Sequence, residues 1–320
     1  MDNVMEFWRF IRAQTTNQSP VMLLYVVESL GSSPGRQGFC LAVNAAGEMI
    51  GSVGGGIMEY KFVEMAKELL AGSPSYNALH KQVHNKEAVK NQSGMICSGE
   101  QTILLYLLQP HDHLSVNAVI DCLQRHAAGC LSFSEKGMSF SDRSPANRYT
   151  FVPGTGNAWL YEEQIGYHDH LYIIGAGHCG LALSKQMRAL DFYIHLLDER
   201  NDLNTIHEND FVHEIIMLDS YHAIAPFIKE GANSYVVVMT PGYRTDDMVI
   251  RALLYKQFRY LGVLGSASKI KTMFTGYTEE GIDPGFLKNI HAPVGLPIKS
   301  HTPEEIAISI AAQVIAVKNG

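Results

Sequence analysis

The chain has 320 residues, enough for two domains that each bury a core of their own. Hydrophobic residues make up 46% of it and charged residues 18%, which excludes a largely disordered protein. The formal net charge of -7 argues against nucleic acid as the main partner, because phosphate binding favours an excess of Lys and Arg.

The N-terminal stretch MDNVMEFWRFIRAQ predicts an amphipathic helix. It is not expected to be a signal peptide, because it lacks a basic start followed by an apolar run. No apolar run reaches the roughly 20 residues of a membrane span. The five cysteines include no CxxC pair, so neither a disulfide framework nor a structural zinc site is expected. We therefore expect a cytoplasmic protein without a membrane segment.

The first half of the chain predicts short strands around one clear helix. MLLYVVESL (22–30) is typical of a strand, and the turn-rich loop GSSPGRQG (31–38) follows it. FCLAVNAAGEMIGSV predicts two strands joined by a turn at NAAGE. An apolar face of helical spacing comes next and ends near Gly72. Its members are Met58, Phe62, Met65, Ala66 and Leu69.

Further short strands are predicted up to residue 165. TILLYLL (102–108) is typical of a buried strand, and 117–125 of a helix. Residues 129–165 predict short strands with a hairpin at Lys136 and Gly137. We expect YEEQIGYHDH (161–170) to be an acidic connector between two domains, 1–165 and 166–320.

From Leu171 onwards, strands and helices alternate. This rhythm predicts a parallel sheet with helices on both faces. Two of the expected helices are HAIAPFIKE (222–230) and DDMVIRALLYKQF (246–258). In the last helix, Thr302 is a good N-cap and Glu305 completes a capping box. The predicted fold is α/β: a mixed N-terminal domain and a C-terminal, Rossmann-like, doubly wound sheet.

A nucleotide-type motif lies at the start of the second domain. Gly175, Gly177 and Gly180 form G-x-G-x-x-G between a predicted strand and a predicted helix. Such glycines permit the tight turn, the approach of a pyrophosphate and close packing of helix on strand. Asp198 ends the second strand, where an acid can bind a ribose hydroxyl pair. The alternative is a Rossmann scaffold that keeps these glycines for packing alone.

The nature of the nucleotide stays open between NAD and NADP. Asp198 favours an unphosphorylated ribose, whereas Arg200 would suit a 2′-phosphate. His178 lies inside the glycine loop, where it either reaches the phosphates or faces solvent.

A second glycine loop, GSVGGGIME, precedes the first long helix. Gly54, Gly55 and Gly56 allow positive φ and leave N–H groups uncovered, and the helix start adds a partial positive charge. Ser52 offers a hydroxyl, and Glu59 could accept N–H groups of a heterocycle. The loop is therefore a candidate anion pocket; the alternative is a turn that needs glycine for geometry only.

Two other segments favour the binding interpretation. GSSPGRQG offers Ser32, Ser33 and Arg36, and arginine suits bidentate phosphate binding. GMICSGEQT places Cys97 in a Gly/Ser turn, where backbone N–H groups would favour the thiolate. The alternative for Cys97 is a small buried side chain, as expected for most free cysteines.

In this order, five motifs resemble those of the XdhC/CoxI family, the accessory proteins of xanthine dehydrogenase and related molybdenum hydroxylases. The motifs are GSSPGRQG, GSVGGGIME, CSGE, IIGAGHCG and PVGLPIKSHTPEEIAISI. The resemblance covers about 20–110 and 170–317. It implies a chaperone that binds the molybdenum cofactor (molybdopterin), assists its sulfuration by a cysteine desulfurase and inserts it into the apo-hydroxylase. We also expect a homodimer.

The resemblance assigns roles to single residues. Cys97 becomes the candidate metal ligand, since a thiolate suits molybdenum with open positions. The candidate molybdenum-cofactor residues are Ser32, Ser33, Arg36, Gly54, Gly55, Gly56 and Glu59. The chain departs from the family pattern at Pro241 and Tyr243, where family members commonly carry histidines, although Asp246 remains.

Two other functional classes remain as alternatives. An NAD(P)-dependent oxidoreductase is favoured by the glycine motif, but His178 and Asp246 are its only nearby acid/base candidates. A nucleotide-sensing interaction module would instead change its affinity for a partner protein without turnover.

Overall fold

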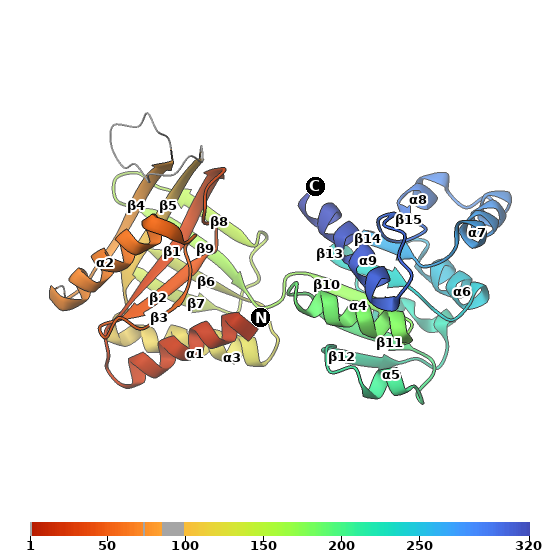
Figure 1. Cartoon of the computed structure of the whole chain (residues 1–320), viewed down its shortest axis with the longest axis horizontal. Coiled ribbons are helices and arrows are strands. Elements are labelled where there is room, and N and C mark those ends of the chain that lie inside the picture. Colours follow the sequence, from red (N-terminus) through yellow and green to blue (C-terminus); the bar gives the residue numbers. More distant parts are fainter. Residues whose placement is uncertain (1, 73, 85–98) are drawn as a thin grey trace. The chain divides into compact units, whose positions relative to one another are not determined.

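The computed structural model describes residues 2–72, 74–84 and 99–320 (Figure 1). The chain forms two compact units, Met1–Gly166 and Tyr167–Gly320. Both combine helices and strands, so the fold is α/β as predicted. None of the helices in the described ranges has the length and hydropathy that a membrane span requires.

The N-terminal unit is built on a five-stranded antiparallel sheet with the order β3-β2-β1-β5-β4. Its strands are β1 (Val21–Gly31), β2 (Cys40–Asn44), β3 (Met49–Gly51), β4 (Asn77–His84) and β5 (Gly99–Leu107). β1 is central because its side chains are apolar on both faces, and seven consecutive residues of it are buried. The predicted turn at NAAGE joins β2 to β3.

Different elements cover the two faces of this sheet. Helix α2 (Gly56–Gly72) packs on one face through Met58, Phe62, Val63 and Ala66. The other face packs against helices α1 (Asp2–Thr16) and α3 (His113–Gln124) and a second sheet. That sheet is antiparallel, with the order β7-β6-β9-β8. Its strands are β6 (Gly129–Ser134), β7 (Gly137–Ser141), β8 (Tyr149–Pro153) and β9 (Trp159–Ile165).

One end of the five-stranded sheet gathers the predicted cofactor segments. β1 ends at Gly31, which pairs with Gly99 at the start of β5. β3 ends at Gly51, which pairs with Leu41 near the start of β2. The loops 31–38 and 52–55 therefore leave the sheet at the same end, and α2 begins there.

The C-terminal unit is a six-stranded parallel sheet with the order β12-β11-β10-β13-β14-β15. Its strands are β10 (His170–Ile174), β11 (Tyr193–Asp198), β12 (Glu214–Met217), β13 (Gly231–Val238), β14 (Phe258–Val263) and β15 (Ile290–His291). In order of sequence this is 3-2-1-4-5-6, the Rossmann order. The direction of winding reverses between β10 and β13, and this switch point is where such sheets bind ligands.

Helices cover both faces of this sheet, as the alternating pattern predicts (Figure 1). α4 (His178–Arg188) and α9 (Pro303–Asn319) pack on one face, while α6 (Tyr243–Leu253) and α7 (Ala267–Glu279) pack on the other. Short helices α5 (Asn204–His207) and α8 (Pro284–Lys288) complete the unit. The capping box of α9 forms as predicted, with the Thr302 side chain accepting from the Glu305 N–H.

Several predicted elements differ from the structure. Residues 161–165 belong to β9 and not to a connector. HAIAPFIKE forms two 3₁₀ turns, η2 (Tyr221–Ala223) and η3 (Ala225–Phe227), because Pro226 cannot continue an α-helix. α6 stops at Leu253 although the predicted helix ran to 258. Met65 of α2 is exposed, since Val63 takes the place expected for it in the core.

Candidate functional site

The loops 31–38 and 52–55 pack directly on each other. A Cβ on Gly35 would lie 2.2 Å from the carbonyl oxygen of Val53, and a Cβ on Gly54 would lie 2.5 Å from the Gly35 nitrogen. Both positions therefore require glycine for close approach of two backbones. The two sequence motifs form a single surface at this end of the N-terminal sheet.

All three glycines of the triple have a positive φ, as the sequence predicts. The values are 126° at Gly54, 71° at Gly55 and 70° at Gly56. A Cβ at Gly55 or Gly56 would meet no atom of the described residues within 4 Å. These two need glycine only for the backbone conformation, and the space in front of them is open.

The loop's N–H groups are less available than the sequence suggests. Glu59 reaches back and its Oε2 accepts from the N–H of Val53 (2.9 Å), the N–H of Gly55 (3.0 Å) and the Ser52 hydroxyl (2.6 Å). The Ser52 hydroxyl in turn accepts from the Gly54 N–H at 3.1 Å. Glu59 therefore holds the loop in shape, and its Oε1 accepts from no donor within the described ranges.

The remaining donors lie at the start of α2 and on Arg36. The N–H groups of Gly56 and Ile57 have no hydrogen-bond partner in the described part of the chain, and both residues are exposed. Arg36 is also exposed, and its Nη1 donates to the Gly31 carbonyl at 3.0 Å; its other nitrogens have no hydrogen-bond partner among the described residues.

The two serines of the 31–38 loop have different surroundings. Ser33 is buried, and its hydroxyl donates to the Gly35 carbonyl at 2.9 Å, so it supports the turn. Ser32 is exposed. Ser32 is therefore available to a ligand, whereas Ser33 is occupied.

Cys97, the predicted metal ligand, lies outside the described residues. Gly99, two positions later, is described: a Cβ on it would lie 2.5 Å from the Ser32 carbonyl oxygen. Within the described ranges, no group of three His, Cys, Asp or Glu side chains has a geometry that could hold a metal ion.

The glycine motif of the C-terminal unit has the geometry of a dinucleotide loop. Gly175 has a φ of 117°, and a Cβ there would lie 2.3 Å from the Met239 carbonyl oxygen. A Cβ on Gly180 would lie 2.3 Å from the Gly175 carbonyl oxygen, so helix and loop pack closely. Gly177 faces open space, where a pyrophosphate could approach the start of α4.

Asp198 is less accessible than a typical ribose-binding acid. Its side chain is 1% exposed and accepts from the Ala176 N–H at 2.7 Å. Arg200 donates to both of its oxygens, at 2.9 and 2.7 Å. Burial alone would raise the pKa of Asp198, but these hydrogen bonds hold it below its ordinary value. A ribose would have to displace Arg200. His178 is exposed on the first turn of α4.

A buried ion pair at the same edge of the sheet includes a residue that sequence reasoning missed. Asp246 is fully buried on α6 and accepts from the Thr240 N–H (3.1 Å) and the Thr240 hydroxyl (2.5 Å). Lys269 of α7 donates to its other oxygen and to the Leu264 carbonyl. The available signal was GSASK, a polar helix start directly after a predicted strand.

A second polar cluster lies between the two sheets of the N-terminal unit. The Tyr161 hydroxyl donates to Glu163 at 3.3 Å, and Arg148 lies over the Tyr149 ring. Burial raises the pKa of Glu163 to about 7, although Arg148 and Tyr161 partly oppose the rise. Burial also raises the pKa of the Cys40 thiol, which disfavours its thiolate form.

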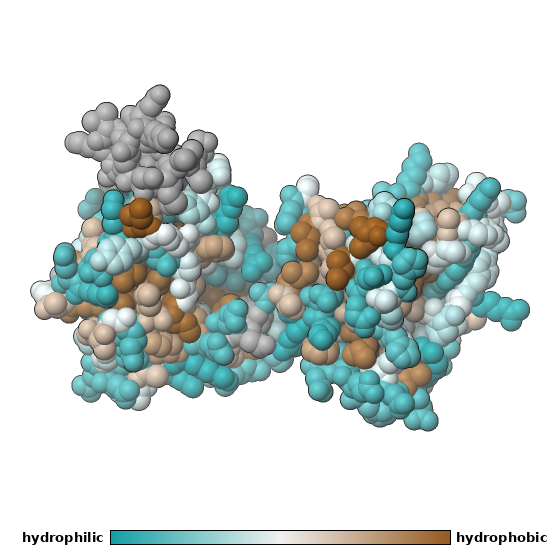
Figure 2. All heavy atoms as spheres, in the orientation of Figure 1, coloured by the Kyte–Doolittle hydropathy of each residue, from teal (hydrophilic) through white to brown (hydrophobic). Residues whose placement is uncertain are grey.

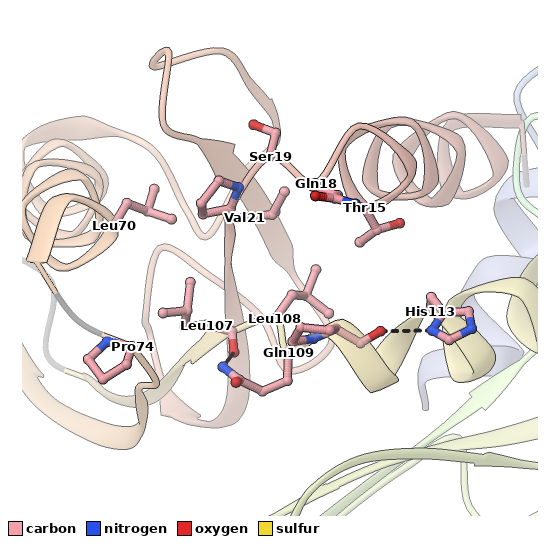
Figure 3. Close-up of a pocket in the computed structure, with 12 residues that line it drawn as sticks. Thr15, Gln18, Ser19, Val21, Leu70, Pro74, Leu107, Leu108, Gln109 and His113 are labelled. Carbon is pink, nitrogen blue, oxygen red and sulfur yellow. Dashed lines mark hydrogen bonds between the residues drawn. The ribbon is translucent and has the colours of Figure 1, made fainter.

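The N-terminal unit has a pocket that none of the residues predicted to bind the molybdenum cofactor lines (Figure 3). It has a volume of about 630 Å³ and lies where β1 begins and β5 ends, opposite to the glycine loop. Leu70, Pro74, Leu107 and Val21 supply apolar walls, and the His113 ring contacts the Pro110 carbonyl at 2.7 Å.

Apolar side chains are exposed on each unit, as the brown spheres of Figure 2 show. Large hydrophobic residues that are exposed around the N-terminal glycine loop include Leu30, Ile57 and Tyr60. On the C-terminal unit, Ile308 and Ile315 share one face of α9.

The strand order and the glycine geometry define a Rossmann-type C-terminal unit, and the N-terminal unit carries a separate candidate site in its glycine loop. Comparison with family models agrees with both halves. The XdhC Rossmann domain matches residues 171–314, and the XdhC and CoxI family model matches residues 15–80. The chain belongs to the XdhC and CoxI family.

The chain is also similar to individual proteins. It is 24% identical over 303 residues to the protein YqeB of Escherichia coli (strain K12), covering 94% of this chain and 44% of that protein. It is 34% identical over 82 residues to a probable xanthine dehydrogenase component of Bacillus subtilis (strain 168), covering 26% and 23%. The chain thus spans less than half the length of these relatives.

One solved structure has the same fold along nearly the whole chain. It is the crystal structure of a xanthine dehydrogenase from Bacillus halodurans, with a TM-score of 0.70 and 20% sequence identity. The match covers 98% of this chain and 95% of that one. At this identity the likeness concerns the fold.

Proposed function

We propose that this protein is an accessory protein of a xanthine dehydrogenase-type molybdenum hydroxylase, and that its N-terminal unit binds the molybdenum cofactor. Family membership supports the class of function. The observation that carries the site is the contact between loops 31–38 and 52–55, which brings Arg36 and the start of α2 to one end of the sheet.

The residues present fit the phosphate of a pterin cofactor. Arg36 offers guanidinium donors, and Gly56 and Ile57 offer N–H groups at a helix N-terminus. The open space at Gly55 and Gly56 lets a ligand approach the backbone. Glu59 acts indirectly, since it shapes the loop. We retain Cys97 as the proposed metal ligand; a bound thiolate would hold molybdenum during transfer.

The finer steps of this function follow from the family resemblance. We propose that the protein receives the cofactor, protects it during sulfuration by a cysteine desulfurase and delivers it to the apo-hydroxylase, in the cytoplasm and as a homodimer. The exposed Leu30, Ile57 and Tyr60 beside the glycine loop would suit contact with such a partner.

Cofactor retention by the purified protein tests the proposal. We expect about one molybdenum and one pterin per chain after gel filtration, measured by metal analysis and by fluorescence of the oxidised pterin. Arg36→Ala and Cys97→Ala should each lower retention at least about fivefold. Arg125→Ala, which removes an exposed arginine of α3's C-terminal end, is the matched control. A wild-type protein that never retains cofactor would overturn the proposal.

A nucleotide site in the C-terminal unit is a second proposal, favoured by the strand order and by the geometry of Gly175, Gly177 and Gly180. Such a site would bind NAD or NADP. The protein would then be either an oxidoreductase or a nucleotide-sensing module. Titration with NADH separates binding from no binding. Oxidation of bound NADH by carbonyl substrates, or its absence, then separates the two classes.

A further inference from the structure

Three loops meet at the ligand edge of the C-terminal sheet. They follow β10, β13 and β14 and lead into α4, α6 and α7. A Cβ on Gly175 would lie 3.0 Å from the Thr240 nitrogen, so the first two loops are in contact. The Leu264 N–H donates to the Val238 carbonyl at 2.8 Å, which joins the third loop to the end of β13. Asp246 and Lys269 bridge the second and third loops.

A purely structural role does not explain this ion pair well. Burying two charges carries a desolvation cost that an apolar pair of similar size avoids. Asp246 is fully buried with three donors around it, so its position is fixed. Lys269 is different, because its side chain is 23% exposed at the edge of the sheet.

The ammonium of Lys269 has capacity for one more acceptor. Two of its three N–H groups have partners, the Asp246 carboxylate and the Leu264 carbonyl at 3.1 Å. No described residue accepts the third. The two anchors hold the ammonium in place, so a ligand would meet a donor that is already oriented. The helix starts of α4, α6 and α7 add partial positive charge along the same edge.

The position of Lys269 in the strand order identifies the part of a ligand it would meet. A nucleotide on the glycine loop has its first ribose at the end of β11, near Asp198. The second half of a dinucleotide crosses the switch point in the other direction, over β13 and towards β14. Lys269 follows β14, whose backbone lies two strands or about 10 Å from β10. A mononucleotide whose ribose lies at Asp198 extends from the glycine loop towards β11, away from β14.

We propose that Lys269 contacts the second nucleotide of a bound dinucleotide, and that Asp246 is the residue that positions Lys269 there. The inference rests on the proposed nucleotide site and narrows its ligand to the class of dinucleotides. The acceptor is an oxygen of the ligand's distal ribose or phosphate.

The full chain, titrated with NADH and separately with ADP, tests this assignment. We expect Lys269→Met to weaken NADH binding about tenfold or more and to change ADP binding less than about twofold. Lys271→Met removes an exposed lysine from the same helix and should change neither. Asp246→Asn should also weaken NADH relative to ADP, whereas general damage to the fold would weaken both ligands together.

The results distinguish failure of the role of Lys269 from failure of the nucleotide site itself. If wild-type protein binds NADH and Lys269→Met binds it equally well, the role of Lys269 is overturned while the nucleotide site stands. Equal loss of NADH and ADP overturns it too, because contact with the distal half alone predicts a selective loss. Wild-type protein that binds neither ligand overturns both the nucleotide site and this inference. Lys269→Arg, which keeps the charge, should recover part of the NADH affinity.

Discussion

Glycines that look equivalent in the sequence have different roles at the level of the residue. Gly54 combines a φ of 126° with a backbone 2.5 Å from its missing Cβ, whereas Gly55 has a φ of 71° and open space. Alanine at Gly54 must therefore displace the 31–38 loop, while alanine at Gly55 only takes up an unfavourable backbone conformation.

We expect Gly55→Ala to lower the free energy of unfolding by about 1 kcal/mol and Gly54→Ala by about 3 kcal/mol. Urea denaturation followed by tryptophan fluorescence measures both. Equal costs at the two positions would contradict the contact between the loops.

A second prediction at this scale concerns Glu163. Its pKa is about 7 in the folded chain and about 4.5 when unfolded, so between these values the folded chain keeps a proton that the unfolded chain loses. The free energy of unfolding should therefore fall by about 3 kcal/mol as pH rises from 4.5 to 7. Urea midpoints of the N-terminal unit, followed by the fluorescence of Trp8 and Trp159, should show the fall in wild type and in the exposed-site control Glu68→Gln. Glu163→Gln should flatten it, and a slope that survives this change would exclude Glu163 as its cause.

At the level of the element, helix α2 depends on a residue of its own first turn. Glu59 accepts three hydrogen bonds from the loop that precedes it, two of them from backbone N–H groups. We expect Glu59→Ala to cost about 2 kcal/mol of stability and to weaken cofactor retention, since the loop loses its anchor.

Thermal unfolding and cofactor retention check this prediction together. Glu68→Ala, on the exposed face of the same helix, should leave both unchanged. Loss of retention without loss of stability would instead indicate that Glu59 contacts the ligand directly.

Local patterns predicted most elements, and long-range contacts account for most of what they missed. The β2–β3 hairpin, the glycine loops and the cap at Thr302 depend on neighbours a few residues away, so the sequence displays them. Asp246 and Lys269 are 23 residues apart and meet only because β13 and β14 are adjacent. Residues 161–165 pair with β6, some 30 positions earlier. The sequence did not indicate this strand, because the segment contains two adjacent glutamates.

The candidate site divides in the same way. Positive φ at Gly54, Gly55 and Gly56 could be predicted, because consecutive glycines are typical of such turns. Occupation of the loop's N–H groups by Glu59 could not, since it depends on the rotamer of one side chain. The role of Cys97 stays a prediction.

At the level of the whole molecule, the two units carry buried groups that respond to acid in opposite ways. In the C-terminal unit, burial lowers the pKa of His170 to about 4 and also lowers that of His195. Below the ordinary value near 6.5, the unfolded chain takes up protons that the folded unit does not. Acidification from pH 7 to pH 5 should therefore destabilise this unit, while Glu163 stabilises the other.

The chain offers a simple way to observe this difference. Both tryptophans, Trp8 and Trp159, lie in the N-terminal unit, so their fluorescence follows that unit alone, whereas calorimetry follows both. We expect the two transitions to move in opposite directions between pH 7 and pH 5. His170→Gln should reduce the shift of the C-terminal transition, and parallel shifts of both transitions would contradict the assignment.

The pairing of β1 with β5 determines when the N-terminal loops can form during protein synthesis. β1 is the central strand, and Met22 pairs with Leu107, more than eighty positions further along. A ribosome makes Arg36 and the three glycines early, but the sheet that supports them is incomplete until Leu107 has emerged. Contacts of such high sequence separation also form slowly. The loops that would hold a ligand at this end of the sheet can therefore take their final form only after β5 has been synthesised and has paired with β1.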